Sequence, residues 1–243
     1  MSSAAPPLPE FAARLGDRRL FPDLAAWAYL NHAAISPLSR LARAAMGRAI
    51  GDVSREGVGA VGPWMAQRAR LRAALAGFLD CEPEALALTT NTGAGIRAVA
   101  LGFPWAAGDR VLLFEGEFPA NITPWQQAAA LFELELRFAS LAPFAAPGGA
   151  DLGEVEAALQ AGVRLVAVSA VQFRSGLRMP IEALGELCRR YGAALCVDAA
   201  QGVGLTPLLA GSADFIAAPG HKWLMGPEGT GFLVIHRDQR LRP

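Results

Sequence analysis

Residues 164–198 read RLVAVSAVQFRSGLRMPIEALGELCRRYGAALCVD, and the order of patterns in this stretch decides the fold. The apolar run RLVAVSAV (164–171) is followed by the helical pattern IEALGELCRRYG (181–192) and by a second apolar run, ALCVD (194–198). Short runs that are apolar on both faces are typical of buried strands in a parallel sheet. The stretch therefore predicts a strand, a helix and a second strand of one α/β structure.

The same alternation of helical and strand patterns continues on both sides of this stretch. It predicts an α/β fold in which a mostly parallel sheet lies between two layers of helices, a three-layer α/β/α arrangement. The expected helices cover residues 40–53, 64–79, 92–103, 123–134, 151–161 and 181–192, and the expected strands cover 86–90, 111–114, 135–140, 164–171, 194–198, 214–218 and 231–236.

The composition argues against several kinds of partner. The chain has 243 residues, of which 53% are hydrophobic and 18% charged, which is enough for one sizeable α/β core. The formal net charge is zero, so nothing indicates a nucleic acid or an anionic membrane surface as a partner. No apolar run reaches the roughly 18 residues that a transmembrane helix requires.

The cysteines and histidines do not predict a metal site or a disulfide framework. Cys81, Cys188 and Cys196 have neither paired nor metal-type spacing, and we expect buried thiols in a reducing cytoplasm. The three histidines are too scattered in the sequence to indicate bound metal.

Sites in parallel sheets gather at the carboxyl ends of the strands, and two of the predicted strand ends carry distinctive residues. Asp198 ends a strand in VDAAQGVG (197–204), where a buried carboxylate needs a cation or hydrogen bonds; the alternative is a helix cap or a loop contact. In TTNTGAGI (89–96), Thr92 and Gly93 stand where a helix begins, and its free N–H groups and dipole suit a phosphate. The alternative there is an ordinary threonine cap.

A third strand end leads into APGHKWLMGPEGTGFLVI (218–235), in which a chain with few lysines places Lys222 among small and apolar residues. Desolvation in such surroundings should lower the pKa of the amine. A neutral amine is a nucleophile that forms a Schiff base with a carbonyl group. The alternative is a lysine that extends along the surface into solvent.

Together the three strand ends suit one phosphate-bearing aldehyde, pyridoxal 5′-phosphate. Thr92 and Gly93 would bind its phosphate, Lys222 its aldehyde, and Asp198 the protonated ring nitrogen. An aromatic side chain should lie on one face of the ring, and Phe118 in GEFPAN (116–121) follows another strand end.

The motifs identify a resemblance to the class V aminotransferases, pyridoxal-phosphate enzymes of fold type I. This family includes cysteine desulfurases, selenocysteine lyases, isopenicillin epimerase-like proteins and kynureninase relatives. The resemblance implies an N-terminal arm (1–28) and a cofactor-binding large domain (29–243), with the small C-terminal domain of the family absent from the chain. The matching motifs are YLNHAA (29–34), TTNTGAGI (89–96), EFPANITPWQ (117–126), VDAAQGVG (197–204) and GHKWLMGPEGTGFL (220–233).

The resemblance also implies roles for individual residues. Lys222 and Asp198 would be catalytic, as the Schiff-base lysine and the partner of the ring nitrogen. Asn31 and His32 fall where the N-terminal segment approaches the substrate. The further cofactor-binding positions would be Thr92, Gly93 and His221 at the phosphate, Gln201 near the phenolic oxygen, Phe118 on the ring face, and Gln172 where the family has asparagine.

Three departures from the desulfurases bear on the reaction. Pro219 stands where they commonly have a serine at the phosphate, and Phe118 stands where they have a ring-stacking histidine. The family asparagine is replaced within QFRSG (172–176). Loss of the histidine removes an acid/base group above the ring, which favours a lyase, epimerase or aminotransferase. The resemblance further implies an amino-acid substrate and a homodimer, with helix 64–79 and the arm at the interface.

Two other interpretations stay open at this point. One is a non-catalytic relative that folds and dimerises without turning over a substrate. The other is a dinucleotide-binding oxidoreductase, because GAGIRA (93–98) fits the glycine fingerprint through Gly93 and Gly95, and Glu115 ends the next strand.

Overall fold

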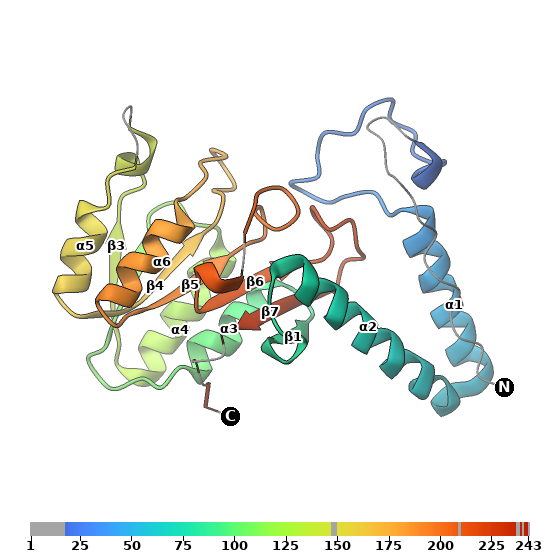
Figure 1. The fold of residues 1–243 in the computed structure, drawn as a ribbon, viewed down its shortest axis with the longest axis horizontal. Coiled ribbons are helices and arrows are strands. Elements are labelled where there is room, and N and C mark those ends of the chain that lie inside the picture. The colour runs from blue at the N-terminus through green and yellow to red at the C-terminus, as the bar shows by residue number, and fades with distance from the viewer. Residues whose placement is uncertain (1–17, 147–149, 209, 237–238, 240, 243) are drawn as a thin grey trace.

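The computed structural model describes residues 18–146, 150–208, 210–236, 239 and 241–242. Its seven strands form one sheet in the order β1-β7-β6-β5-β4-β2-β3 (Figure 1). β7 runs antiparallel to both of its neighbours, β1 and β6, and all other pairs are parallel, so the prediction of a mostly parallel sheet is confirmed. The strands are β1 (Leu86–Thr89), β2 (Arg110–Phe114), β3 (Glu135–Ala139), β4 (Val163–Ser169), β5 (Ala194–Asp198), β6 (Phe215–Pro219) and β7 (Gly231–Ile235).

Helices cover both faces of the sheet, which confirms the predicted three layers. Two of them, α3 and α4, pack on one face; α5, α6 and the C-terminal end of α2 pack on the other (Figure 1). The α-helices are α1 (Arg40–Glu56), α2 (Val61–Leu79), α3 (Thr92–Gly102), α4 (Thr123–Phe132), α5 (Gly153–Gln160) and α6 (Ile181–Arg190).

The central strand β4 shows why the apolar runs form this sheet. Successive side chains of a strand point to opposite faces. Leu165 and Ala167 belong to the core beneath α3 and α4, whereas Val166 and Val168 belong to the core beneath α5 and α6. A strand buried on both faces therefore has to be apolar throughout.

The arrangement of α1 and α2 differs from what their amphipathic patterns suggested. Both helices form, but α1 buries none of its side chains, and α2 buries only Ala76 and Leu79, near its end. The two helices project to one side of the sheet (Figure 1), and only the C-terminal end of α2 packs against it. Residues 1–17 of the predicted arm lie outside the described residues. The exposed apolar side chains of the two helices include Met46, Ile50, Val53, Val61, Met65, Leu71 and Phe78.

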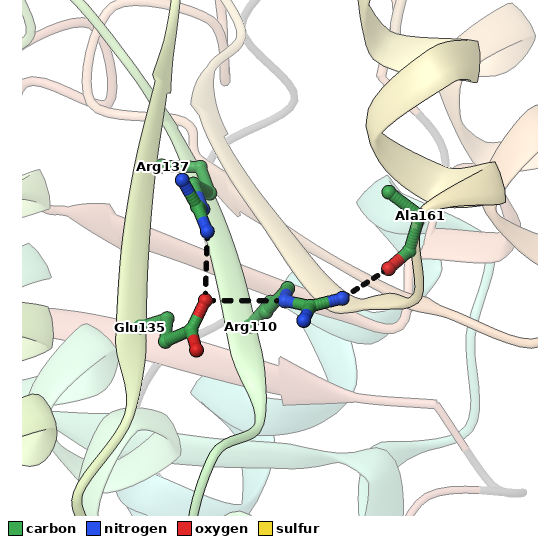
Figure 2. Close-up of polar contacts among 4 residues, drawn as sticks. All are labelled: Arg110, Glu135, Arg137 and Ala161. Atoms are coloured by element: carbon green, nitrogen blue, oxygen red, sulfur yellow. Dashed lines mark hydrogen bonds and ion pairs between the residues drawn. The ribbon is translucent and has the colours of Figure 1, made fainter.

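At the far edge, charged side chains connect β3 to its neighbours. The Glu135 carboxylate accepts hydrogen bonds from Arg110 Nε at 3.2 Å and from Arg137 Nη2 at 2.8 Å (Figure 2). Arg110 also donates to the carbonyl oxygen of Ala161, just after α5. Charges on an edge strand oppose pairing with a further strand, so these residues protect this edge of the sheet.

Ser169, Asp198 and Pro219 are the last residues of β4, β5 and β6. Ser169 pairs in register with Asp198, so these parallel strands end at one common edge of the sheet. This edge is where the sequence predicted the site. None of the helices in the described part of the chain has the length and apolar character needed to cross a bilayer.

Candidate functional site

A small cavity opens at the carboxyl edge of the sheet and brings together residues from distant parts of the sequence. Five of the predicted site residues line it: Thr92, Phe118, Asp198, Gln201 and Lys222. Six further residues line the cavity that the sequence interpretation did not include among the site residues: Ala120, Ser169, Val171, Phe173, Ala200 and Pro219.

Asp198 is a buried carboxylate at the floor of the cavity. Its Oδ1 accepts a hydrogen bond from the Ala200 N–H at 2.9 Å, and no other hydrogen bond to it occurs within the described residues. Burial raises the pKa of Asp198 to about 7; the Ala200 hydrogen bond opposes the rise, the nearby Glu117 charge adds to it, and Lys222 opposes it. The carboxyl group thus titrates near neutral pH.

Lys222 lines the same cavity as Asp198. Burial lowers the pKa of its amine, and the attraction of Asp198 only partly opposes this, as the sequence led us to expect. The Nζ atom is 5.8 Å from the centre of the Phe118 ring. Lys222 is also the only lysine in the sequence. A partly desolvated amine of this kind is suited to nucleophilic attack on a carbonyl carbon.

The N-terminal segment holds the backbone that carries Lys222. Buried Ser36 donates its N–H to the carbonyl of His221 at 2.8 Å and its hydroxyl to the carbonyl of Lys222 at 2.5 Å. His32 Nδ1 lies 2.7 Å from the same hydroxyl, and its ring centre is 5.7 Å from that of Trp223. Asn31 is exposed. Neither Asn31 nor His32 lines the cavity, although their segment adjoins it.

Gln201 connects the same segment to the cavity wall. Its Nε2 donates to the carbonyl of Ala33 at 2.8 Å, and its Oε1 accepts from Trp223 Nε1 at 2.7 Å. Both ends of the amide therefore already have a partner. One donor hydrogen and one acceptor lone pair remain for a ligand.

The beginning of α3 provides the predicted anion site. Asn91, and not Thr92, is the helix cap, because its side chain accepts from the Ala94 N–H at 2.8 Å. Thr92 is buried at the first helical position, where its own N–H and that of Gly93 have no intrahelical acceptor. These donors and the helix dipole suit a phosphate group.

His221 supplies a second observation that fits an anionic ligand. Its Nδ1 atom is buried and has no hydrogen-bond partner within the described residues. Buried polar atoms are nearly always hydrogen-bonded, so this nitrogen is available to a ligand. Neither His221 nor Gly93 lines the cavity, but each is the chain neighbour of a residue that does. The first turn of α3, the amine of Lys222 and the carboxyl of Asp198 make a set of groups that fits pyridoxal phosphate.

Gln172 does not line the cavity. It is buried, and its Nε2 donates to Glu117 Oε1 at 2.8 Å. Glu117 and Phe173 were missed, although both lie in quoted motifs. Phe173 packs edge-on against Phe118 with ring centres 5.2 Å apart. The only feature of the sequence that could have indicated Glu117 is its place just after an apolar strand. Glu115 has the same place and is exposed, so this feature does not single out Glu117.

The topology contradicts the dinucleotide interpretation. That motif requires the strand before the glycines and the strand ending in the acidic residue to belong to one βαβ unit. Here β7, β6, β5 and β4 lie between β1 and β2. Gly95 instead allows α3 to lie close to the sheet, since a Cβ atom there would come within 2.9 Å of the Ala217 Cβ.

The chain is similar to known proteins over most of its length. Residues 29–243 match the family model Aminotransferase class-V. A probable cysteine desulfurase of Pyrococcus abyssi (strain GE5 / Orsay) is 35% identical over 171 residues, which are 69% of this chain and 42% of the relative. Isopenicillin N epimerase of Amycolatopsis lactamdurans is 38% identical over 180 residues, 71% of this chain and 45% of the relative.

Solved structures have the same fold. A mutant of C-DES with glycine covalently linked to its PLP cofactor superposes with a TM-score of 0.86 at 31% identity, covering 93% of this chain and 62% of that chain. A cysteine desulfurase from Thermococcus onnurineus NA1 superposes with a TM-score of 0.76 at 28% identity, over 88% of this chain and 55% of that one. The chain therefore spans less than half of the two sequence relatives and about three fifths of these structures.

Proposed function

Because the chain belongs to the class V aminotransferase family, whose cofactor is pyridoxal phosphate, we propose that it is the cofactor-binding part of an enzyme that acts on an amino acid. Residues 29–243 would form its large domain. The observation that carries the proposal is that Lys222 and Asp198 line the same small cavity as Thr92, although 130 residues separate Thr92 from Lys222 in sequence.

Each of these side chains would have its own task. The Lys222 amine, poorly solvated and therefore easily deprotonated, would hold the cofactor through its aldehyde until the amine of a substrate takes its place. Thr92, the Gly93 N–H and His221 would bind the phosphate, and Phe118 would lie on one face of the ring. Asp198, once ionised, would keep the ring nitrogen protonated. When bound, pyridoxal phosphate acts as an electron sink for a carbanion at the substrate.

Proton transfer would fall to Lys222 after the substrate has displaced it. The freed amine remains near the reacting carbon and can accept or donate a proton as general base or acid. Phe118 cannot do so. We therefore favour a lyase, epimerase or aminotransferase reaction over desulfuration, and Cys188 and Cys196 fit this choice because they are buried. Burial raises the pKa of Cys188 to about 12, so its thiol stays protonated.

We further infer a homodimer and a cytoplasmic location. The exposed apolar side chains of α1 and α2 would be covered by the second subunit. Leu71→Glu in α2 should then increase the monomer fraction in sedimentation experiments, whereas Phe138→Glu on the edge strand β3 should not. Three free cysteines within the described residues fit a reducing compartment.

The proposal is tested by titrating the chain with pyridoxal phosphate and recording the absorbance spectrum. The wild type should develop a band near the edge of the visible range, and Lys222→Ala should not. Amino acids added one at a time should then change the band, and analysis of the products would identify the reaction. If none of the amino acids changes the band, the result would support the other interpretation, a non-catalytic relative, and would contradict the enzymatic one.

A further inference from the structure

A second buried carboxylate, that of Glu117, lies beside the cavity and has no part in the chemistry described above. It is 7% exposed. Its Oε1 accepts hydrogen bonds from the Ser169 N–H at 2.7 Å and from Gln172 Nε2 at 2.8 Å, and its Oε2 accepts one from the Ser169 hydroxyl. Three donors thus converge on one side chain. All three contacts are donated to it, so the two oxygens of Glu117 act as acceptors throughout.

No cationic side chain within the described residues forms an ion pair with Glu117. Its hydrogen-bond donor Ser169 is the register partner of Asp198 on the adjacent strand. The two buried carboxylates therefore flank one strand end, and Lys222 is the only lysine near them. Like charges at short range disfavour each other's ionisation.

We propose that Glu117 is a positioning residue of this pocket: its oxygens hold the Ser169 and Gln172 side chains, and its negative charge disfavours a second negative charge at the neighbouring Asp198 until a cation binds there. A cation bound there, such as a protonated ring nitrogen, would favour the ionised Asp198 carboxylate, and the proton of the carboxyl group would pass to solvent. The role at the ring rests on the proposed function; the effect on Asp198 does not, because it belongs to the cofactor-free chain.

The contacts of Glu117 allow its charge to be separated from its geometry. In Glu117→Gln, the amide oxygen can occupy the place of Oε1 and still accept from Ser169 N–H and Gln172 Nε2. The new NH₂ group then faces the Ser169 hydroxyl, which can rotate from donor to acceptor. The charge is lost while the three contacts are kept. Glu117→Ala removes the charge and the three contacts together.

The groups that act on the Asp198 carboxyl come from three elements. Glu117 lies in the loop after β2 and Lys222 in the loop after β6. The third is the backbone N–H of Ala200, just after β5, which donates to the carboxylate. The nearby Cys196 thiol of β5 carries no charge, because burial raises its pKa. Of the three, only Glu117 is a second negative charge, so its removal should allow Asp198 to ionise at lower pH.

The test is a carbon-13 NMR titration of the Asp198 carboxyl in the cofactor-free chain. The midpoint should move to lower pH in Glu117→Gln. It should stay at the wild-type value in Glu115→Gln, the same change at an exposed position two residues away, and in Gln172→Leu, which leaves the Glu117 charge in place. Hydrogen exchange of the Gln172 side-chain amide should stay slow in Glu117→Gln and become fast in Glu117→Ala.

An Asp198 midpoint that does not move in Glu117→Gln, or that moves as far in Gln172→Leu, overturns the proposal. Failure of Glu117→Gln to fold also overturns it, because the hydrogen bonds are kept and only the charge is lost. Failure of the wild type to bind pyridoxal phosphate would contradict the proposed function and would leave the titration result unchanged.

Discussion

The amine nitrogen of Lys222 lies 5.8 Å from the centre of the Phe118 ring, so the one lysine of the chain faces an aromatic side chain across the cavity. A flat heterocycle bonded to that amine would lie against this ring. Phe173, which also lines the cavity, packs edge-on against Phe118 at an interplanar angle of 79°.

Phe118→Ala should therefore weaken the binding of pyridoxal phosphate. Aromatic pairs contribute about 0.5–1.5 kcal/mol beyond the burial of area, which corresponds to roughly 2- to 10-fold in the dissociation constant. Equilibrium titration measures the change. Phe138→Ala is a matched control, since Phe138 is 49% exposed against 45% for Phe118 but lies on the edge strand β3. Equal binding by the wild type and Phe118→Ala would exclude a stacking role.

Asp198→Asn should stabilise the cofactor-free chain, and more so at higher pH. Burial raises the pKa of Asp198 from its ordinary value of 3.8 to about 7. Between these values the unfolded chain releases the proton while the folded chain keeps it, so the wild type loses stability as the pH rises from 4 to 7. Asparagine does not titrate. At 1.36 kcal/mol for each pKa unit, the advantage of the variant should reach about 4 kcal/mol above pH 7.

Urea unfolding at a series of pH values measures this difference. It should be smallest near pH 4 and level off above pH 7. The exposed carboxylate Glu115 is the control, since Glu115→Gln should show no such trend. A constant difference between Asp198→Asn and the wild type across this range would mean that the folded state does not hold the proton.

Gly95→Ala should destabilise the fold, because the added Cβ would lie 2.9 Å from the Ala217 Cβ and 3.5 Å from the Leu233 Cβ. Overpacking of this kind costs about 1–3 kcal/mol. Gly47→Ala in α1 is the matched control, since its Cβ would meet no atom within 4 Å. That change should be neutral or stabilising by up to about 1 kcal/mol. Thermal unfolding compares the two; equal stabilities would contradict the close packing of α3 on β6.

Periodicity was sufficient to predict the helices and strands, because burial on both faces makes a strand such as β4 apolar throughout. It could not predict what covers a helix. Apart from the C-terminal end of α2, the apolar residues of α1 and α2 are not buried within this chain. A sequence pattern does not say whether the surface that covers a helix belongs to the same molecule.

Site residues could be predicted where they directly follow the end of a strand. They were missed where the conformation of the following loop decides which side chain is buried. Glu115 and Glu117 are separated by Gly116, whose φ of 75° reverses the chain, so that the first is exposed and the second buried. The contact of Gln201 with Ala33 spans 168 residues and leaves no trace in any local pattern.

The most direct test of the central claim is to find where pyridoxal phosphate becomes bonded to the chain. Borohydride reduction of the loaded protein, followed by digestion and mass spectrometry, should place one reduced adduct on Lys222. Lys222→Arg, which keeps the positive charge, should carry none at an internal residue. Because the sequence contains no other lysine, the result is unambiguous. An adduct confined to the N-terminal amine, or none in the wild type, would contradict the account.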